Sequence, residues 1–209
     1  MPFRRRNPFV AGEGILPLLV VAAAGVLGFR YFSPWAAVLA LVLFILLFLL
    51  FRDPRRQAPS SALGIVSPVD GKVVEVEKSD RCVVQGEAYR VRIRVNSFGT
   101  YTARSPVEGK VMNLKSREQG VGPDCPGNAF WVQTDEGDNV VLQFQGYRFG
   151  LVPKSFVRYG ERIGQGHRCA YLRLTRYAEV YLPIAGQVVV KPGQPVLAGS
   201  DLIGSVPHS

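Results

Sequence analysis

The sequence predicts a mainly β protein, in which a compact β-sandwich or barrel-sandwich-like domain with an internal repeat follows an N-terminal transmembrane helical hairpin. Three observations support this: two uncharged apolar runs near the N-terminus, short alternating segments separated by Gly and Pro, and two motifs that each occur twice. The chain has 209 residues, 47% of them hydrophobic, and a formal net charge of +9. We expect a membrane anchor in residues 1–56 and a β domain in residues 57–209.

Two uncharged apolar runs, 15–29 and 35–51, predict the two helices of the hairpin. The second run is long enough to cross the hydrocarbon core at about 1.5 Å per residue, whereas the first is short. Pro34 suits the first turn of the second helix, and Tyr31 and Trp35 suit a membrane interface. Two alternatives stay open: a cleaved signal peptide, and a first segment that lies in the interface without spanning.

Arginines flank the hairpin at both outer ends, whereas the connection between the two runs contains Arg30 alone. The flanking arginines are Arg4, Arg5, Arg6, Arg52, Arg55 and Arg56. The positive-inside bias therefore predicts that both ends, and with them the β domain, lie in the cytoplasm and that the basic flanks face anionic headgroups. Elsewhere basic and acidic residues alternate without a dense basic run, which argues against nucleic acid as a partner.

The three cysteines, Cys82, Cys125 and Cys169, are far apart and form no C-x-x-C pair. In a cytoplasmic domain we expect three reduced thiols, most of them buried. The chain has two histidines, His167 and His208, so the sequence predicts no metal site.

Strands dominate the prediction after residue 56. Residues 72–77 and 89–95 alternate, which places Val91, Ile93 and Val95 on one face and the arginines between them on the other. Further strands are predicted at 130–133, 140–144, 171–174, 180–182 and 188–190. Residues 57–63 form a polar linker, and no long stretch beyond it has a helical period.

Two motifs each occur twice in the β domain. Ser-Pro-Val-Asp-Gly-Lys-Val at 67–73 returns as Ser-Pro-Val-Glu-Gly-Lys-Val at 105–111, and the Gly-rich segment 157–166 is echoed at 190–199. Two copies do not make a solenoid. Such V-x-x-G-x-x-V turns resemble those of lipoyl- and biotin-carrier-like sandwiches, in which two similar halves interlock, although the Met-Lys-Met tip of those carriers is missing. We expect one domain, large enough to bury its own core.

Residues 172–183 read Leu-Arg-Leu-Thr-Arg-Tyr-Ala-Glu-Val-Tyr-Leu-Pro. This segment resembles the processing segment of the short bacterial and archaeal phosphatidylserine decarboxylases, which have Arg-Phe-Gly-Ser-Arg-Val-Asp-Val-Tyr-Leu-Pro. Residues 51–56, 67–73 and 98–106 resemble three further family motifs, in the family's order. The resemblance covers most of the chain.

The resemblance implies a particular chemistry. In the family, a carboxylate and a histidine activate a serine that is cut from its glycine and becomes a pyruvoyl group. That group forms a Schiff base with the amine of phosphatidylserine and acts as the electron sink for decarboxylation.

This chain departs from that pattern. Asp70 falls on the family's carboxylate, but Tyr101 falls on the histidine, and Thr175 and Arg176 fall on the glycine and serine. A phenol, with a pKa of about 10, is a poorer base near neutral pH than an imidazole at about 6.5. Arg176 has no hydroxyl group, and that of Thr175 is out of register. We therefore expect no cofactor, with a pyruvoyl group arising only if an unrecognised serine is processed.

Two arginines match or adjoin family positions and are expected to bind substrate phosphate: Arg104 and Arg148. Structural alternatives stay open for the other matches. Asp70 precedes a glycine and suits a turn, Tyr101 suits packing, and Arg104 could be a solvated edge charge. The Gly-Ser pairs near the C-terminus, at residues 199–200 and 204–205, look like ordinary turns.

These features predict a membrane protein of phospholipid metabolism, related to phosphatidylserine decarboxylase and located in the bacterial inner membrane. We expect that it does not process itself and that it binds phospholipid headgroups or acts as a partner of an active enzyme. The alternatives are an active decarboxylase with an atypical site and a structural membrane scaffold. The expected partners are membrane phospholipids, a second copy of the chain or an active decarboxylase.

Overall fold

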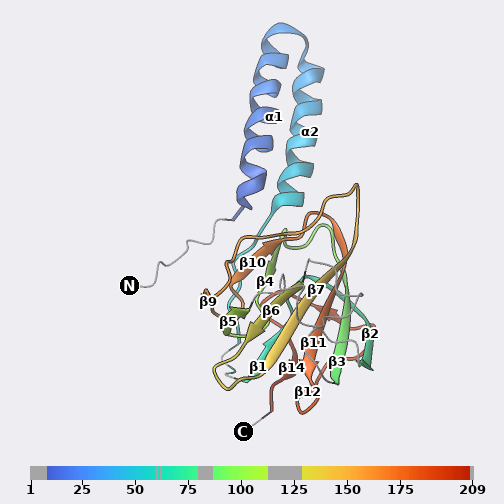
Figure 1. Cartoon of the computed structure of the whole chain (residues 1–209). Coiled ribbons are helices and arrows are strands. Elements are labelled where there is room, and N and C mark those ends of the chain that lie inside the picture. Colours follow the sequence, from blue (N-terminus) through green and yellow to red (C-terminus); the bar gives the residue numbers. More distant parts are fainter. Residues whose placement is uncertain (1–8, 60, 62, 80–86, 113–128, 208–209) are drawn as a thin grey trace. The chain divides into compact units, whose positions relative to one another are not determined.

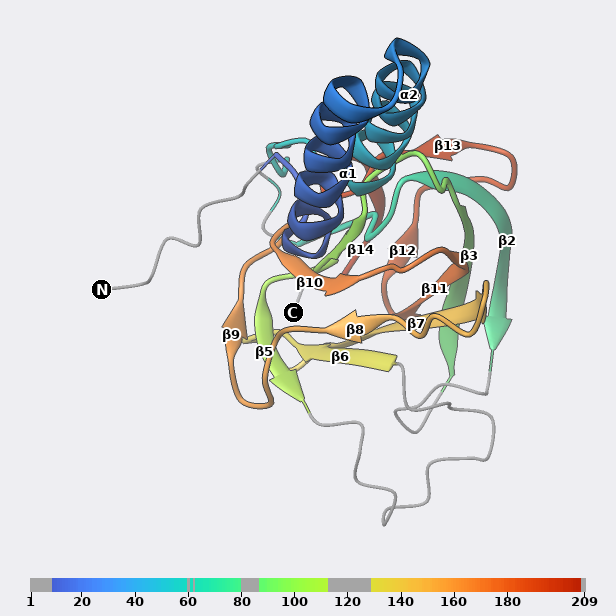
Figure 2. The same cartoon turned by 90° about the horizontal axis from the view of Figure 1, so that it is seen from above.

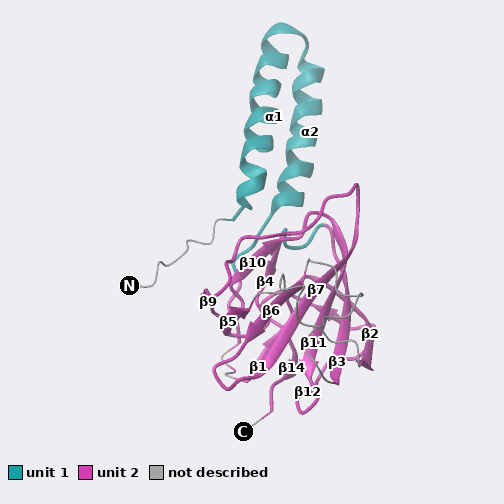
Figure 3. Cartoon of the chain, in the orientation of Figure 1, with its two compact units in different colours: residues 1–55, 98–101 teal, residues 56–97, 102–209 magenta. Residues whose placement is uncertain are grey.

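The computed structural model describes residues 9–59, 61, 63–79, 87–112 and 129–207. The chain divides into two compact units (Figure 3). Unit 1 contains residues 1–55 together with 98–101, and unit 2 contains residues 56–97 and 102–209.

Unit 1 is a hairpin of two apolar helices, α1 (Gly12–Tyr31) and α2 (Pro34–Phe51) (Figure 1), which confirms the predicted hairpin. Both helices are long and apolar enough to cross a membrane. At about 1.5 Å per residue they measure about 30 and 27 Å. Pro34 occupies the first turn of α2, and the hydroxyl of Ser33 accepts a hydrogen bond from the N–H of Trp35 at 3.3 Å.

Small residues let the two helices approach closely. A Cβ atom on Gly25 would lie 3.0 Å from the Cβ of Ala40, and one on Gly28 would lie 3.1 Å from the Cβ of Ala36. Such contacts stabilise helix pairs in lipid, where the hydrophobic effect between helices is absent. At the open end of the hairpin, the N–H of Ala11 donates to the carbonyl of Phe51 at 2.9 Å.

Unit 2 is built from antiparallel strands in three sheets, so its mainly β class is confirmed. The largest sheet has the order β13-β2-β3-β11-β7-β6-β5-β9, and the two others have the orders β1-β14-β12 and β4-β10-β8. Figure 2 shows β2 and β3 at one side of unit 2 and β5 and β9 at the other. The strands are β1 (Gly64–Val66), β2 (Gly71–Ser79), β3 (Ala88–Val95), β4 (Thr102–Arg104), β5 (Gly109–Met112), β6 (Ala129–Gln133), β7 (Asn139–Tyr147), β8 (Lys154–Ser155), β9 (Arg162–Ile163), β10 (Arg168–Tyr171), β11 (Thr175–Pro183), β12 (Gln187–Val188), β13 (Pro195–Val196) and β14 (Leu202–Ser205).

The inward-facing residues of these strands form one main core. Val91 and Ile93 are fully buried, as the alternation in β3 predicted, and they pack with residues of the other sheets such as Ile65 and Ile203. Cys169 is free and buried in the same core, and burial raises the pKa of its thiol well above the ordinary value. Cys82, Cys125 and His208 lie outside the described residues.

The two sequence repeats occupy equivalent places in unit 2. The hydroxyl of Ser67 donates to the carbonyl of Val69 at 2.8 Å, and that of Ser105 donates to the carbonyl of Val107 at the same distance. Each copy of the first motif also accepts a hydrogen bond from a copy of the second. The N–H of Gly199 donates to the carbonyl of Ser67, and the N–H of Gly166 donates to the carbonyl of Ser105. The equivalence explains why both motifs recur in the sequence.

Two predicted strands differ from the structure. The strand predicted at 171–174 is wrong, because β10 ends at Tyr171 and the chain then turns before β11. The N–H of Thr175 closes this turn by donating to the carbonyl of Leu172 at 3.0 Å. The strand predicted at 188–190 is shorter than expected: β12 ends at Val188, and a turn at 191–194 follows.

Candidate functional site

Asp70, at the position expected for a catalytic carboxylate, lies in the turn before β2 and is buried. Its carboxylate accepts hydrogen bonds from both terminal nitrogens of Arg56, one of them at 2.9 Å. It also accepts from the backbone N–H of Ala198 at 2.7 Å. Asp70 thus ties the first residue of unit 2 to the turn that follows β13.

Tyr101, at the position expected for a histidine, belongs to unit 1. Its hydroxyl donates to the Oε2 atom of Glu13 at 3.1 Å, and its ring centroid lies 4.7 Å from that of Phe51. Its N–H donates to the carbonyl of Arg52 at 3.1 Å. Tyr101 therefore contacts both helices at the open end of the hairpin. Its phenol proton forms a hydrogen bond to the carboxylate of Glu13.

The two residues at the expected cleavage position follow a tight turn. Arg173 and Leu174 have φ angles of 46° and 64°, a left-handed conformation that is unusual for side chains of this size. Thr175 is buried, and its hydroxyl donates to the carbonyl of Leu172. Arg176 is the next residue of β11, and its side chain is exposed.

Arg176 takes part in a surface cavity of about 130 Å³, which we call the arginine pocket. Its lining residues are Arg94, Val95, Ser97, Arg148, Arg176 and Tyr177. Strand register brings them together, because Tyr177 of β11 lies opposite Arg94 of β3. On the other side of β11, Gly146 leaves room for Arg176, since a Cβ atom on this glycine would lie 3.2 Å from that of Arg176.

The arginine pocket carries three positive charges. In the part of the chain that the structure describes, no ion pair neutralises Arg94, Arg148 or Arg176. Three guanidinium groups around one cavity repel one another, and a bound anion relieves that repulsion. The forked donors of arginine fit the oxygens of a phosphate or carboxylate group.

Arg104, the other arginine expected to bind substrate, lies elsewhere in unit 2. It is 1% exposed and is not among the residues that line the arginine pocket. Its Nη1 atom donates to the carbonyl of Gly166 at 3.0 Å, and a Cβ atom on Gly199 would lie 2.6 Å from its Cδ atom. Arg104 therefore supports the turns of the second repeat from inside the domain.

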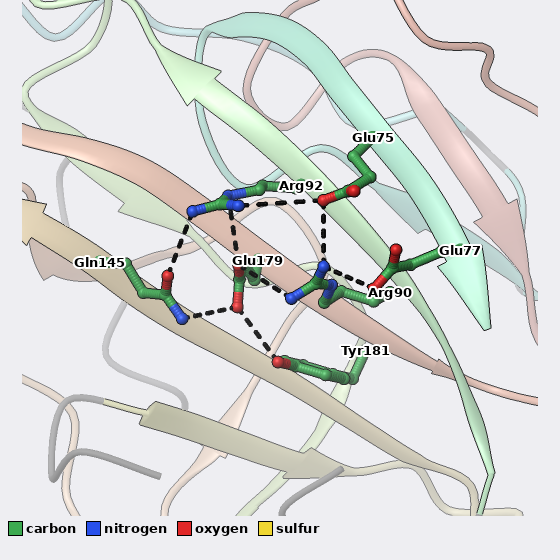
Figure 4. Close-up of polar contacts among 7 residues, drawn as sticks. All are labelled: Glu75, Glu77, Arg90, Arg92, Gln145, Glu179 and Tyr181. Carbon is green, nitrogen blue, oxygen red and sulfur yellow. Dashed lines mark hydrogen bonds and ion pairs between the residues drawn. The ribbon is translucent and has the colours of Figure 1, made fainter. Parts of the chain in front are cut away.

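A polar network connects side chains of β2, β3, β7 and β11 (Figure 4). Its centre is Glu179, which is fully buried and accepts hydrogen bonds from Gln145 at 2.9 Å and Tyr181 at 3.1 Å. Glu179 also pairs with the guanidinium groups of Arg92 at 3.3 Å and Arg90 at 3.6 Å. Burial alone lowers the pKa of Arg90, but the surrounding carboxylates, Glu179 foremost, raise it above the ordinary value.

Comparison with known proteins shows relatives over nearly the whole chain. The phosphatidylserine decarboxylase proenzyme of Nitrosomonas europaea is 33% identical over 94% of this chain and 91% of its own length. The chain belongs to the phosphatidylserine decarboxylase family. The proenzyme of Burkholderia ambifaria is 30% identical over 95% of this chain and 93% of its own length.

Two further comparisons add little to the family assignment. No family model matches the chain. Among solved structures, glucose permease IIA from Mycoplasma capricolum aligns with a TM-score of 0.45 at 21% identity, covering 68% of this chain and 94% of that one. The phosphatidylserine decarboxylase relatives support a role in phospholipid metabolism.

Thr175 and Arg176, at the position where the family's cleavage is expected, do not fit the way in which its pyruvoyl group arises. That group requires a serine, and Arg176 offers no hydroxyl that could eliminate. The hydroxyl of the preceding residue, Thr175, donates to the carbonyl of Leu172.

The structure brings together two of the predicted site residues, Arg148 and Arg176, in the arginine pocket. Four lining residues of the pocket were not predicted as site residues from the sequence: Arg94, Val95, Ser97 and Tyr177. The alternation of β3 showed which face Arg94 occupies, but no sequence pattern shows that Tyr177 lies opposite it.

Proposed function

We propose that this member of the phosphatidylserine decarboxylase family stays a single uncut chain and binds phospholipid headgroups in the arginine pocket. One observation carries the proposal: the residue in the place of the processed serine, Arg176, is a lining residue of a pocket that also contains Arg94 and Arg148. The substitution removes the reactive hydroxyl and adds an anion-binding group at one position.

The chemistry of the pocket supports a phosphate-bearing ligand. Phospholipid headgroups carry a phosphate, and that of phosphatidylserine adds a carboxylate. Guanidinium groups bind both kinds of anion with paired, charge-assisted hydrogen bonds. Ser97 and Tyr177 also line the pocket and carry hydroxyl groups. Membrane phospholipids are thus the proposed partners, in preference to an active decarboxylase or a second copy of the chain.

The first prediction is that the purified protein keeps the full mass calculated for one chain, 23.0 kDa. Self-cleavage needs a serine hydroxyl next to the bond that breaks, and Arg176 supplies none. Intact-mass spectrometry of the protein purified from membranes measures this directly. Two fragments that meet near residue 175, or a new terminus that reacts with a carbonyl-specific amine, would refute the proposal.

Release of carbon dioxide from phosphatidylserine by the purified chain would refute it as well. The alternative of an active decarboxylase with an atypical site would then replace it. The matched control is a proenzyme of the family, such as that of Nitrosomonas europaea, assayed in the same lipid.

The second prediction concerns topology. We propose that the chain resides in the bacterial inner membrane with unit 2 in the cytoplasm, because arginines flank both outer ends of the hairpin. A reporter fused after residue 209 should then be active in the cytoplasm and inactive in the periplasm. As a control, a reporter inserted between α1 and α2 should show the opposite pattern. Digestion of unit 2 by protease added outside intact spheroplasts would contradict this orientation.

A further inference from the structure

A short loop between β7 and β8 combines an exposed aromatic side chain with an unusual backbone. We call residues 148–152 the tip loop. The N–H of Leu151 closes it by donating to the carbonyl of Arg148 at 3.1 Å. Phe149 and Gly150, between them, have φ angles of 54° and 68°, and the side chain of Phe149 is 89% exposed.

Folding in water does not account for this arrangement. A left-handed backbone is unfavourable for a bulky residue, whereas glycine adopts it freely. An exposed phenyl ring also contributes none of the stability that burial of such a side chain would give. Leu151 and Val152, the next two residues, are also exposed. The tip loop thus presents apolar surface at a cost to the stability of unit 2.

The tip loop adjoins the arginine pocket. Arg148 is both the first residue of the loop and a lining residue of the pocket. In Figure 1 the loop that follows β7 lies at one end of unit 2, and β12 lies at the other end. An apolar tip next to a cluster of arginines matches the two layers of a bilayer surface, the acyl boundary and the headgroup phosphates.

The same chain keeps a bilayer within reach of unit 2. Arg56, the first residue of unit 2, follows Phe51 at the end of α2 by five residues. A segment of that length spans at most about 17 Å, at roughly 3.3–3.6 Å per residue. Since both helices are apolar enough to cross a membrane, this short link gives the bilayer a high effective concentration at the domain surface.

We propose that the tip loop inserts Phe149 and Leu151 into the headgroup–acyl boundary of the bilayer. The insertion places the arginine pocket at the level of the lipid phosphates. The identity of the pocket's ligand rests on the proposed function. Insertion of the loop is argued separately, from the exposed side chain of Phe149, its positive φ angle and the place of the loop next to the arginine pocket.

The test uses the full chain in lipid nanodiscs, with Cys82 and Cys125 replaced by serine and Cys169 left in the core. A single cysteine is placed at Phe149→Cys or, with Phe149 kept, at Leu151→Cys, and is labelled with the environment-sensitive fluorophore NBD. The matched control is Val189→Cys, because Val189 is also apolar and exposed but follows β12. Doxyl-labelled phosphatidylcholine then reports contact with the acyl boundary.

We expect a blue shift and strong quenching at positions 149 and 151, and neither at position 189. Equal behaviour at all three positions would overturn the proposal. A shift at 149 and 151 that depends on protein concentration, without quenching by doxyl lipid, would also overturn it and would assign the loop to protein contacts.

Nanodiscs of uncharged phosphatidylcholine separate this inference from the proposed function. Loop insertion should persist there, whatever anion the arginine pocket binds. If quenching fails while a soluble headgroup still binds, the insertion proposal is wrong and the proposed function stands. A second variant, Phe149→Gly, should melt at a higher temperature in detergent than Phe149→Ala, because glycine adopts the positive φ without strain and alanine does not. A lower melting temperature for Phe149→Gly than for Phe149→Ala would contradict the backbone argument on which the inference partly rests.

Discussion

Replacing Glu179 by alanine is expected to lower the free energy of unfolding of unit 2 by about 3 kcal/mol. Glu179 is fully buried, and its carboxylate accepts hydrogen bonds from Gln145 and Tyr181 while it pairs with two arginines. Removing it takes the carboxylate acceptor away from the buried hydroxyl of Tyr181 and from the half-buried donors of Gln145, Arg90 and Arg92. At about 2–4 °C per kcal/mol for a domain of this size, the melting temperature in detergent should fall by about 10 °C.

Glu77→Ala is the matched control for that measurement. Glu77 also pairs with Arg90, but its side chain is 43% exposed. Water screens an exposed pair, so this change should cost at most about 1 kcal/mol. Equal losses for the two variants would contradict the central place that the structure gives to Glu179.

The fold was predictable where local patterns repeat. The copies at 67–73 and 105–111 indicated two equivalent halves, and the structure gives both serines the same hydrogen bond. The alternation of β3 placed Val91 and Ile93 in the core. Long apolar runs predicted both helices, because a membrane-spanning helix needs little besides length and hydrophobicity.

The candidate site was predictable only in part, because it depends on pairing between distant segments. Arg148 and Arg176 were selected by their places in a family pattern, whereas the approach of Arg94 depends on the register of β3 against β11. The turn before Thr175 was missed because Arg173 and Leu174 adopt positive φ angles without glycine. Local propensity assigns such residues to strands or helices, and here the closing hydrogen bonds of the turn prevail.

The last prediction is that Arg176→Ser weakens headgroup binding without restoring self-cleavage. Loss of one guanidinium should reduce the affinity for glycerophosphoserine, a soluble headgroup probe, by about 10- to 100-fold, since a charge-assisted hydrogen bond contributes about 1.5–3 kcal/mol. Isothermal titration of the full chain in detergent measures this. Arg158→Ser, which removes an exposed arginine outside the pocket, should leave the affinity unchanged.

The same variant tests the missing chemistry by intact mass. Serine at position 176 restores the family's hydroxyl, but Thr175 still occupies the glycine position. Tyr101 still donates a hydrogen bond to Glu13. Catalytic groups that act together give little activity when only one of them is restored. The chain with Arg176→Ser should therefore stay uncut. If Arg176→Ser cuts itself, the remaining machinery is intact and a single substitution separates this chain from its active relatives. If binding survives unchanged instead, the phosphate ligand lies outside the arginine pocket.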